Sequence, residues 1–239
     1  MMLANNIENL LRANPYPGRG IITGRSEDGA RSIMAYFIMG RSENSRNRVF
    51  EKTDDGIRTK AFDPAKMTDP SLVIYRPVRE LAGQLIVTNG DQTDTIYEHL
   101  KNNKDFRTAL QTREFEPDAP NYTPRISGLI ERDGSYALSI LKTTCGDPTC
   151  CCRFFYEYPT ALPGLGHFIS TYKTDGDPLP PFEGEPIPIK ITVTDGLEQF
   201  ANTIWDALNR DNKVSLYARE TKIPTGESND IIINKKVTT

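Results

Sequence analysis

The sequence predicts an α+β fold in a single domain. Apolar segments of strand type are numerous, whereas helical segments are few and do not alternate strictly with the strands, as they would in a parallel α/β sheet. No obvious linker divides the 239 residues, and 37% of them are hydrophobic, which is enough to bury a substantial core. We therefore expect one domain over residues 1–239, with residues 1–14 as a helical extension.

Four segments show the apolar spacing of a helix, in which every third or fourth residue is apolar. They are residues 3–13, 94–100, 106–110 and 195–208. Asp195 stands at the N-cap position of the last segment, which is the most strongly amphipathic. Its expected buried stripe consists of Leu197, Phe200, Ala201, Ile204, Trp205 and Leu208.

Strands are expected where short runs of β-branched and aromatic residues lie between turn residues. Both alternating faces of residues 32–39 are apolar, so this strand should be covered on both sides. The clearest hairpin, residues 126–143, turns at Asp133-Gly134. A long irregular connection is expected at residues 174–188, which are rich in Pro and Gly. The other expected strands cover residues 20–23, 71–75, 84–88, 154–158, 168–172, 189–193, 214–219 and 231–233.

Charge and terminal composition restrict the class of partner. The net charge is −3 and the pI about 5.6, so no broad positive field is available for nucleic acid. No apolar run reaches the roughly 18 residues that predict a membrane span, and the N-terminus lacks the pattern of a secretory signal. The four cysteines should then be reduced thiols. We expect a soluble cytoplasmic protein that binds neither nucleic acid nor membranes.

Motifs for metals and cofactors are not recognisable in the sequence. The four cysteines form one cluster between residues 145 and 152, whereas zinc sites usually combine two separated pairs of ligands. We expect His99 to be solvated on a helix and His167 to lie in a turn. Gly18-Arg19-Gly20 lacks the spacing of a dinucleotide-binding or phosphate-binding loop. No cofactor and no metal ligand are therefore expected.

Arginines at strand ends and in loops are more informative. A guanidinium group stays charged and binds phosphate through two parallel hydrogen bonds, so several converging arginines would form a phosphate pocket. Ordinary surface arginine is about as good an explanation for any single one of them. Residues 41–48 are predicted to be a loop that contributes three of these side chains. The candidates are Arg19, Arg41, Arg46, Arg48, Arg76 and Arg125.

A series of short motifs in a fixed order resembles the archaeal-type inosine monophosphate (IMP) cyclohydrolases, over about residues 16–190. The asparagine–glycine motif at Asn89-Gly90 and the threonine–proline–arginine motif at residues 123–125 are its most specific parts. The order is Gly18-Arg19, Ala35-Tyr36, Gly40-Arg41-Ser42, Arg46-Asn47-Arg48, residues 87–94, residues 121–126, Thr171-Tyr172 and residues 179–186.

This resemblance implies a four-layer αββα sandwich like that of the N-terminal nucleophile hydrolases. Those hydrolases expose a terminal Cys, Ser or Thr, whereas this sequence starts with Met1, so the resemblance implies the scaffold without that nucleophile. The implied reaction closes the ring of 5-formamidoimidazole-4-carboxamide ribonucleotide to give IMP and water, the last step of de novo purine biosynthesis. The reacting groups belong to one molecule, so the enzyme must mainly orient them and assist proton transfer.

The same resemblance suggests which residues do this work. Tyr75, Glu116 and Arg19 are the expected catalytic residues: Glu116 takes or relays the amide proton, Tyr75 donates to the departing oxygen, and Arg19 binds the carboxamide or formyl oxygen. Ordinary strand-end and loop roles remain open for Tyr75 and Glu116. The expected nucleotide-binding residues are Arg41, Asn47, Asn89, Asn121, Thr123 and Arg125.

Two other functions remain open at this point. The chain could be a hydrolase of related fold that cleaves an amide or amidine bond in another substrate. It could also bind purine nucleotides without catalysis. The expected partners are a purine nucleotide and other copies of the chain in a homo-oligomer.

Overall fold

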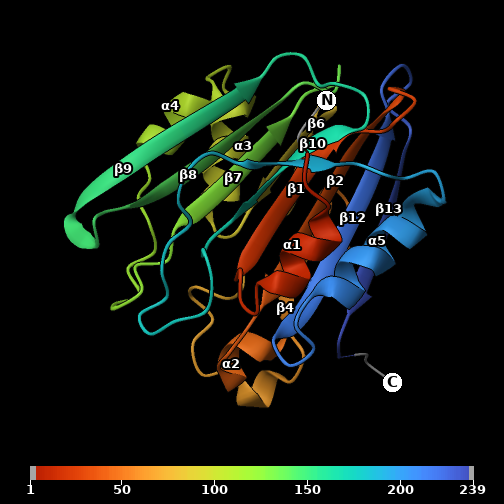
Figure 1. Cartoon of the computed structure of the whole chain (residues 1–239). Coiled ribbons are helices and arrows are strands. Elements are labelled where there is room, and N and C mark those ends of the chain that lie inside the picture. Colours follow the sequence, from red (N-terminus) through yellow and green to blue (C-terminus); the bar gives the residue numbers. More distant parts are fainter. Residues whose placement is uncertain (1–3, 237–239) are drawn as a thin grey trace.

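The computed structural model describes residues 4–236. Within them the strands form two antiparallel sheets that pack face to face, with helices on the outer faces (Figure 1). This arrangement confirms the predicted α+β class.

One sheet has the strand order β11-β10-β1-β2-β12-β13. Arg19 at the start of β1 pairs with Ile38 near the end of β2, so these two ends meet at the same edge of the sandwich. The strands are β1 (Arg19–Arg25), β2 (Arg31–Met39), β10 (Leu165–Ser170), β11 (Ile187–Lys190), β12 (Lys213–Lys222) and β13 (Ser228–Asn234).

The facing sheet runs in sequence order from β3 to β9. Its β7–β8 hairpin confirms the predicted one and turns at Gly134, whose φ of 82° favours glycine. Its strands are β3 (Arg48–Thr53), β4 (Gly56–Ala61), β5 (Val78–Leu81), β6 (Gln84–Thr88), β7 (Arg125–Ile130), β8 (Tyr136–Thr144) and β9 (Asp147–Tyr158).

The helices cover the outside of this pair of sheets. α1 and α5 pack on the sheet that contains β1, and α3 and α4 pack on the sheet that contains β7 (Figure 1). The helices are α1 (Ile7–Ala13), α2 (Glu43–Arg46), α3 (Gln92–Lys101), α4 (Phe106–Gln111), α5 (Gly196–Ala207) and the 3-10 turn η1 (Pro64–Lys66).

Apolar side chains fill the spaces between these layers. On β2, Ile33 and Phe37 face the layer under α1 and α5, while Met34 and Tyr36 face the other sheet. All four are fully buried, which confirms that this strand is covered on both sides. Because the middle of the sandwich is packed, a polar site has room mainly at the ends of the strands.

The N-terminal helix is shorter than predicted. It begins at Ile7, because the Asn6 side chain caps it by accepting a hydrogen bond from Asn9 N at 3.0 Å. Asn5 instead forms a β-bridge with Ile189. Leu3, which was expected on the same helix, lies outside the described residues.

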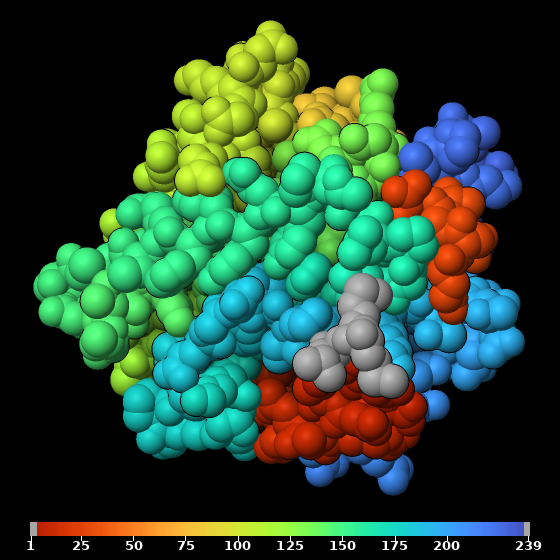
Figure 2. Space-filling model, turned by 45° about the horizontal axis from the view of Figure 1, so that its top comes forward, coloured from red at the N-terminus to blue at the C-terminus, as the bar shows by residue number. Residues whose placement is uncertain are grey.

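The segment after β10 crosses the surface beside this helix. Figure 2 shows the two segments in contact on one face of the molecule, and the Asn14 side-chain amide donates to the Lys173 carbonyl at 2.9 Å. Residues 174–186 are irregular, but the predicted connection of residues 174–188 ends two residues earlier, because Ile187 and Pro188 belong to β11.

The predicted strand at residues 71–75 is wrong. This segment is a turn, in which the amides of Val73 and Ile74 donate to the Pro70 carbonyl. The strand of this region is β5, which starts directly after Pro77. Tyr75 therefore stands on a connecting segment and not in a strand.

Residues 41–48 are also more ordered than the predicted loop. They contain the short helix α2, capped by Ser42, and Arg48 already begins β3. The β3–β4 hairpin was not predicted, because its strands carry many charged residues on their exposed faces. No helix in residues 4–236 is both long and apolar enough to cross a membrane.

Candidate active site

A cluster of buried polar side chains lies at one end of the sandwich. β1 and β7 begin at this end, and β2 and β6 finish there. Arg19 is the first residue of β1, and Arg125 is the first residue of β7. Tyr75 comes from the turn before β5, and Glu116 comes from the loop between α4 and β7. All four side chains are buried. Segments far apart in the sequence thus bring the three predicted catalytic residues to one end of the sandwich.

Glu116 is a buried carboxyl group surrounded by arginines. Its backbone is fixed by a hydrogen bond from Glu116 N to the Thr123 carbonyl at 2.9 Å, and its Oε1 lies 3.4 Å from Asn89 Nδ2. Burial raises the pKa of this carboxyl to about 7, against the opposing effect of Arg19 and Arg125. Near neutral pH it can therefore both accept and donate a proton.

Arg19 is held at the start of β1 by its backbone. Arg19 N donates to Thr171 Oγ1 at 3.1 Å, and Thr171 N donates back to the Arg19 carbonyl at 2.9 Å. This approach requires Gly18, since a β-carbon there would come within 2.3 Å of Thr171 Oγ1. The Arg19 backbone is thereby fixed at the start of β1 without using the guanidinium nitrogens.

The Arg19 guanidinium carries an unused donor. Its Nε is buried and has no hydrogen-bond partner among residues 4–236. Burial alone would lower the pKa of this group, but the charge of Glu116 together with Tyr172 and Tyr75 outweighs burial, so the pKa lies well above its ordinary value. Arg19 therefore stays a cation with a free N–H in a dry site, as an oxyanion-stabilising group needs.

Tyr75 is positioned from two sides. Its backbone N donates to Thr59 Oγ1 at 2.8 Å, and Thr59 N donates to the Tyr75 carbonyl at 2.9 Å. Its hydroxyl lies 2.8 Å from the hydroxyl of Tyr36, which is fully buried on β2. Burial, with Tyr75 as neighbour, raises the pKa of Tyr36 far above its ordinary value, so Tyr36 remains a neutral partner.

Arg48 is a third buried arginine in this region, after Arg19 and Arg125. Its Nε donates to the Ser45 carbonyl at 2.8 Å, while its Nη1 is buried with no partner in the described part of the chain. Burial lowers the pKa of Arg48, and the nearby charge of Arg19 lowers it further. Two close cations with unused donors favour an anion or a strongly polarised oxygen between them.

Asn89 ties the end of β6 to the start of β7. Its Oδ1 accepts from Ile126 N at 2.8 Å and from Gln92 Nε2 at 3.1 Å, while its Nδ2 donates to the Pro124 carbonyl at 2.9 Å. The amide is already largely engaged by the protein. Its hydrogen bonds hold the backbone around the site in place, independently of any contact with a ligand.

Arg125 lies against the first turn of α3. Its Nη1 contacts Asp91 Oδ1 at 2.8 Å and Gln92 Oε1 at 2.6 Å. Burial alone would raise the pKa of Asp91, but Arg125 and Arg113 outweigh burial and lower it. Gly90 leaves the space for this arrangement, because a β-carbon there would come within 2.4 Å of Arg125 Nη1.

Thr123 and Asn121 lie in the loop between α4 and β7 and contact the segment that follows β10. Thr123 Oγ1 donates to Asp118 Oδ2 at 2.5 Å and lies 2.6 Å from the Tyr172 hydroxyl. Asn121 Oδ1 accepts from Leu179 N at 3.0 Å, in the irregular segment after β10. The segment that carries the predicted threonine–proline–arginine motif therefore connects both loops at the site.

Arg41 and Asn47 make their contacts with other residues than Arg19, Tyr75 and Glu116. The Arg41 guanidinium stands 5.2 Å from the Tyr16 ring, which stacks on Tyr172, and its Nη1 donates to Asp175 Oδ1 at 2.8 Å. Arg41 is exposed, so it belongs to the rim. Asn47 is buried and uses both ends of its amide on the backbone of Asp63, at 2.7 and 2.9 Å.

The model of the family described as IMP cyclohydrolase-like protein matches residues 16–226. The chain belongs to this IMP cyclohydrolase-like family. The matched residues include every predicted site residue and the whole of the buried polar cluster.

Several curated relatives of the chain are named IMP cyclohydrolase. The chain is 27% identical over 125 residues to the IMP cyclohydrolase of Methanococcus aeolicus, a match that covers 51% of this chain and 61% of that protein. It is 34% identical over 116 residues to the IMP cyclohydrolase of Methanopyrus kandleri, which covers 47% of this chain and 57% of that protein. With the IMP cyclohydrolase of Methanocella arvoryzae it shares 27% over 153 residues, or 59% and 74% of the two chains.

Three residues of the cluster were not among the predicted site residues of this IMP cyclohydrolase-like chain. Tyr36 and Tyr172 lie within the motifs quoted above, but their apolar surroundings indicate core residues. Arg48 was considered only as one of several loop arginines. Its position at the first residue of a buried strand could have singled it out, since a charged residue there needs a specific reason.

The histidine and cysteine predictions have mixed outcomes. His167 lies in β10 and not in a turn, with its Nδ1 2.7 Å from the Tyr136 hydroxyl. The four cysteines are free thiols at the β8–β9 turn and along β9. Within residues 4–236, no group of three or more His, Cys, Asp or Glu side chains is arranged to hold a metal ion.

Proposed function

We propose that the chain is an IMP cyclohydrolase. The matched region covers only about 61% of the length of the first curated relatives, so their activity is an inference for this chain. In the proposed reaction the carboxamide nitrogen of the formamido ribonucleotide attacks the formyl carbon. A carbon–nitrogen bond forms and the carbon–oxygen bond of the former formyl group breaks. The oxygen leaves as water with one proton from the carboxamide nitrogen and one from the formamide nitrogen, and the purine ring of IMP is complete.

The Glu116 carboxyl carries this proposal. Ring closure removes a proton from a weakly nucleophilic amide and returns one to a departing oxygen. A buried carboxyl with a pKa of about 7 can do both at neutral pH, because neither protonation state is strongly disfavoured. In the proposed mechanism Glu116 takes the amide proton during attack.

Arg19 and Tyr75 act on the formyl oxygen in this mechanism. Negative charge develops on that oxygen as the amide nitrogen attacks, and the free Nε–H of Arg19 is suited to stabilise it. The Tyr75 hydroxyl, held by Tyr36 at 2.8 Å, donates the proton with which the oxygen leaves as water. The geometry supports this division of roles because Arg19, Tyr75 and Glu116 enter the same end of the sandwich from three different segments.

The ribose phosphate is proposed to lie between the catalytic residues and the rim. Arg41 is exposed there and can exchange its contact with Asp175 for a phosphate at little cost. The proposed nucleotide contacts between the rim and the catalytic residues are Arg125, Thr123 and Asn121. Asn89 and Asn47 remain proposed binding residues too, although their amides mainly hold the backbone.

The finer features of the fold and assembly are also proposals. We propose that the layered arrangement is that of the N-terminal nucleophile hydrolases, which the three apolar layers support. We propose a single domain with residues 1–14 as a helical extension, in which Ile7 and Leu11 of α1 pack in the same layer as α5. A cytoplasmic homo-oligomer that requires no cofactor completes the proposal.

The test is to add the purified chain to 5-formamidoimidazole-4-carboxamide ribonucleotide and to follow IMP formation by ultraviolet absorbance and chromatography. We expect stoichiometric IMP at a rate well above the uncatalysed background. Release of formate without IMP would instead identify a hydrolase. Calorimetric binding of IMP without turnover would identify a non-catalytic relative.

A further inference from the structure

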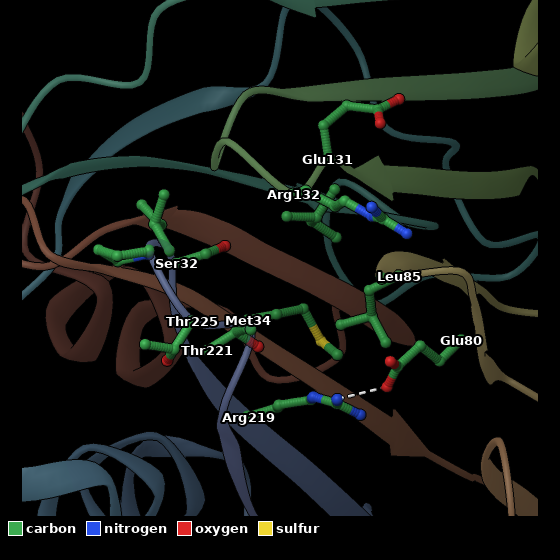
Figure 3. A pocket seen from close by; sticks show the side chains of 14 residues that line it. Ser32, Met34, Glu80, Leu85, Glu131, Arg132, Arg219, Thr221 and Thr225 are labelled. Carbon is green, nitrogen blue, oxygen red and sulfur yellow. Dashed lines mark hydrogen bonds and ion pairs between the residues drawn. The ribbon is translucent and has the colours of Figure 1, made fainter.

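The cysteines are gathered at the β8–β9 turn, outside the polar cluster. This turn projects from one side of the sandwich (Figure 1). The turn and the first half of β9 carry all four cysteines of the chain, and all four are free thiols. In the pocket beside the β12–β13 turn, by contrast, Arg219 is already paired with Glu80, and Met34 is packed in the core (Figure 3). The thiols, unlike these side chains, can be reached from solvent.

Two of the sulfurs are held close together by one hydroxyl group. Thr144, the last residue of β8, donates from Oγ1 to Cys150 Sγ at 3.2 Å, and the same oxygen lies 2.8 Å from Cys152 Sγ. Two atoms at these distances from a third are at most 6.0 Å apart. Cys150 is exposed and Cys152 is half-buried, so a ligand can approach the pair from solvent.

The other two cysteines are placed differently. Cys151 lies between the two residues of the pair, and neighbouring residues of a strand point to opposite faces. It accordingly packs against the apolar layer under α3 and α4. Cys145 is an exposed residue of the turn itself, with a φ of 53°. The chain thus presents one pair of sulfurs that share a contact with Thr144, and two thiols outside that contact.

A pair of thiols selects a metal ion by softness and by coordination number. Thiolate sulfur prefers soft ions such as Cu(I), which is satisfied by two thiolates in a near-linear arrangement. A structural zinc ion requires four ligands, whereas residues 4–236 contain no group of three or more His, Cys, Asp or Glu side chains arranged for a metal ion. Metal–sulfur bonds are about 2.3 Å long, so an ion between two sulfurs spans about 4.6 Å. This span lies within the limit of 6.0 Å for Cys150 and Cys152.

Lys142 supplies a positive charge beside this pair. It is the cross-strand partner of Cys152, so the two side chains lie on the same face of the sheet. Its Nζ donates to the Phe182 carbonyl at 2.5 Å and lies 5.6 Å from the centre of the Phe154 ring. A Cu(I) ion bound by two thiolates carries one net negative charge. A neighbouring ammonium group balances that charge.

We propose that Cys150 and Cys152 form a binding site for one soft monovalent metal ion of the Cu(I) class. The ion forms one bond to each sulfur and takes the place of the two thiol protons, which are released to solvent. The oxidation state of the metal and of both sulfurs is unchanged. The site belongs to the β8–β9 turn alone and does not depend on the proposed cyclohydrolase activity.

The test titrates the full, reduced chain with Cu(I) in the absence of oxygen. Bicinchoninate competes for the metal, and its coloured Cu(I) complex reports the metal that the protein does not hold. We expect the natural chain to withdraw one equivalent of Cu(I). Cys150→Ser and Cys152→Ser should each weaken binding by roughly 100-fold or more, because the second sulfur of a pair binds as an intramolecular ligand at high effective concentration.

Two further cysteine variants are the matched controls. Cys145→Ser and Cys151→Ser should hold Cu(I) as tightly as the natural chain does. Circular dichroism checks the fold of each variant, and Cys150 is exposed, so its replacement leaves the core untouched. Gel filtration checks that the metal does not join two chains. Undiminished binding by Cys150→Ser, an equal loss in all four variants, or a metal-dependent change in oligomeric state would overturn the proposal.

Discussion

Glu116 illustrates how a single residue takes its chemistry from its surroundings. In the sequence it is one of many carboxylates in a loop rich in Pro and Asp. In the structure it is buried beside Arg19 and Asn89, and burial raises its pKa to about 7. A carboxyl with this property is a proton carrier at neutral pH, which is why the proposed mechanism depends on it.

The raised pKa predicts how Glu116 affects stability. Because the folded pKa of about 7 lies above the ordinary value of 4.5, the folded state holds the proton more tightly between these pH values. The contribution of Glu116 to stability therefore falls as pH rises from 4.5 to 7. Unfolding in urea should show that the free energy of unfolding of Glu116→Gln increases relative to that of the natural chain as pH rises from 4.5 to 7. A constant difference from pH 4.5 to 8 would contradict the raised pKa.

Arg125 and Arg113 provide a matched pair of arginines. Both contact Asp91, at 2.8 and 2.6 Å, but only Arg125 is buried at the site. A charged hydrogen bond to the nucleotide is worth about 1.5–3 kcal/mol, so Arg125→Ala should raise the KM for the formamido ribonucleotide by roughly 10–150-fold. Steady-state kinetics should show Arg113→Ala within about twofold of the natural chain. Equal effects of the two substitutions would argue against nucleotide binding by Arg125.

Among single residues, those of the site were predicted from motifs that resemble a family, and not from the chemical properties of their side chains. Arg19, Tyr75 and Glu116 were expected from the family resemblance, and the structure gathers them. Spacing alone could not show this, because their segments are far apart in the chain. Tyr36 was not predicted as a site residue, and Arg48 was predicted only as one of six candidate loop arginines, since burial of a polar group becomes visible only once the packing is known.

At the scale of elements, the corner formed by β6, α3 and β7 holds the site in shape. Asn89 bonds both Ile126 N and the Pro124 carbonyl, and Gln92 adds a third contact from α3. The Asn89 side chain thus supplies hydrogen bonds to β7 at the point where the strand pairing between β6 and β7 ends. The asparagine–glycine motif has a structural explanation here that is independent of any ligand.

Asn89→Ala should accordingly destabilise the fold. It leaves the buried Ile126 N and Pro124 carbonyl without these partners, for which we expect a loss of about 3 kcal/mol in the free energy of unfolding. Asn121→Ala removes one loop contact to Leu179 and should cost no more than about 1 kcal/mol. Chemical denaturation measures both. A loss of less than about 1 kcal/mol for Asn89→Ala would show that the corner is held by other contacts.

Elements with a clear apolar period were predictable, and charged or irregular ones were not. The β7–β8 hairpin and the amphipathic α5 agree with their predictions. The β3–β4 hairpin was missed because its exposed faces carry Glu, Lys and Arg. Residues 71–75 have strand-like composition, but the carbonyl of Pro70 starts a turn there, which places Tyr75 in the site.

At the scale of the whole molecule, the two sheets meet along one side through a group of aromatic rings. His167 on β10 stacks on Tyr158 of β9 with ring centroids 3.9 Å apart, and its Nδ1 lies 2.7 Å from the Tyr136 hydroxyl of β8. Burial lowers the pKa of His167 to about 4. The contact between the sheets therefore depends on a neutral imidazole.

Acidification should weaken this contact in a defined range. The folded pKa of about 4 lies below the ordinary value of 6.5, so the unfolded chain takes up the proton first. The stability contributed by neutral His167 is lost as pH falls from 6.5 towards 4. The melting temperature should fall less in this pH range for His167→Gln, whose side-chain amide can still form a hydrogen bond with the Tyr136 hydroxyl. An identical pH dependence in the two proteins would contradict the lowered pKa.

The central claim is that Glu116 serves ring closure at the buried cluster. The most direct measurement is the rate of IMP formation from the formamido ribonucleotide at pH 7 by the natural chain and by Glu116→Gln, with IMP binding measured in both. We expect turnover by the natural chain, a loss of roughly 10²–10⁴-fold in kcat for the variant, and IMP affinity of similar size in both. Equal kcat values in the two proteins, or no IMP formed by the natural chain, would contradict it.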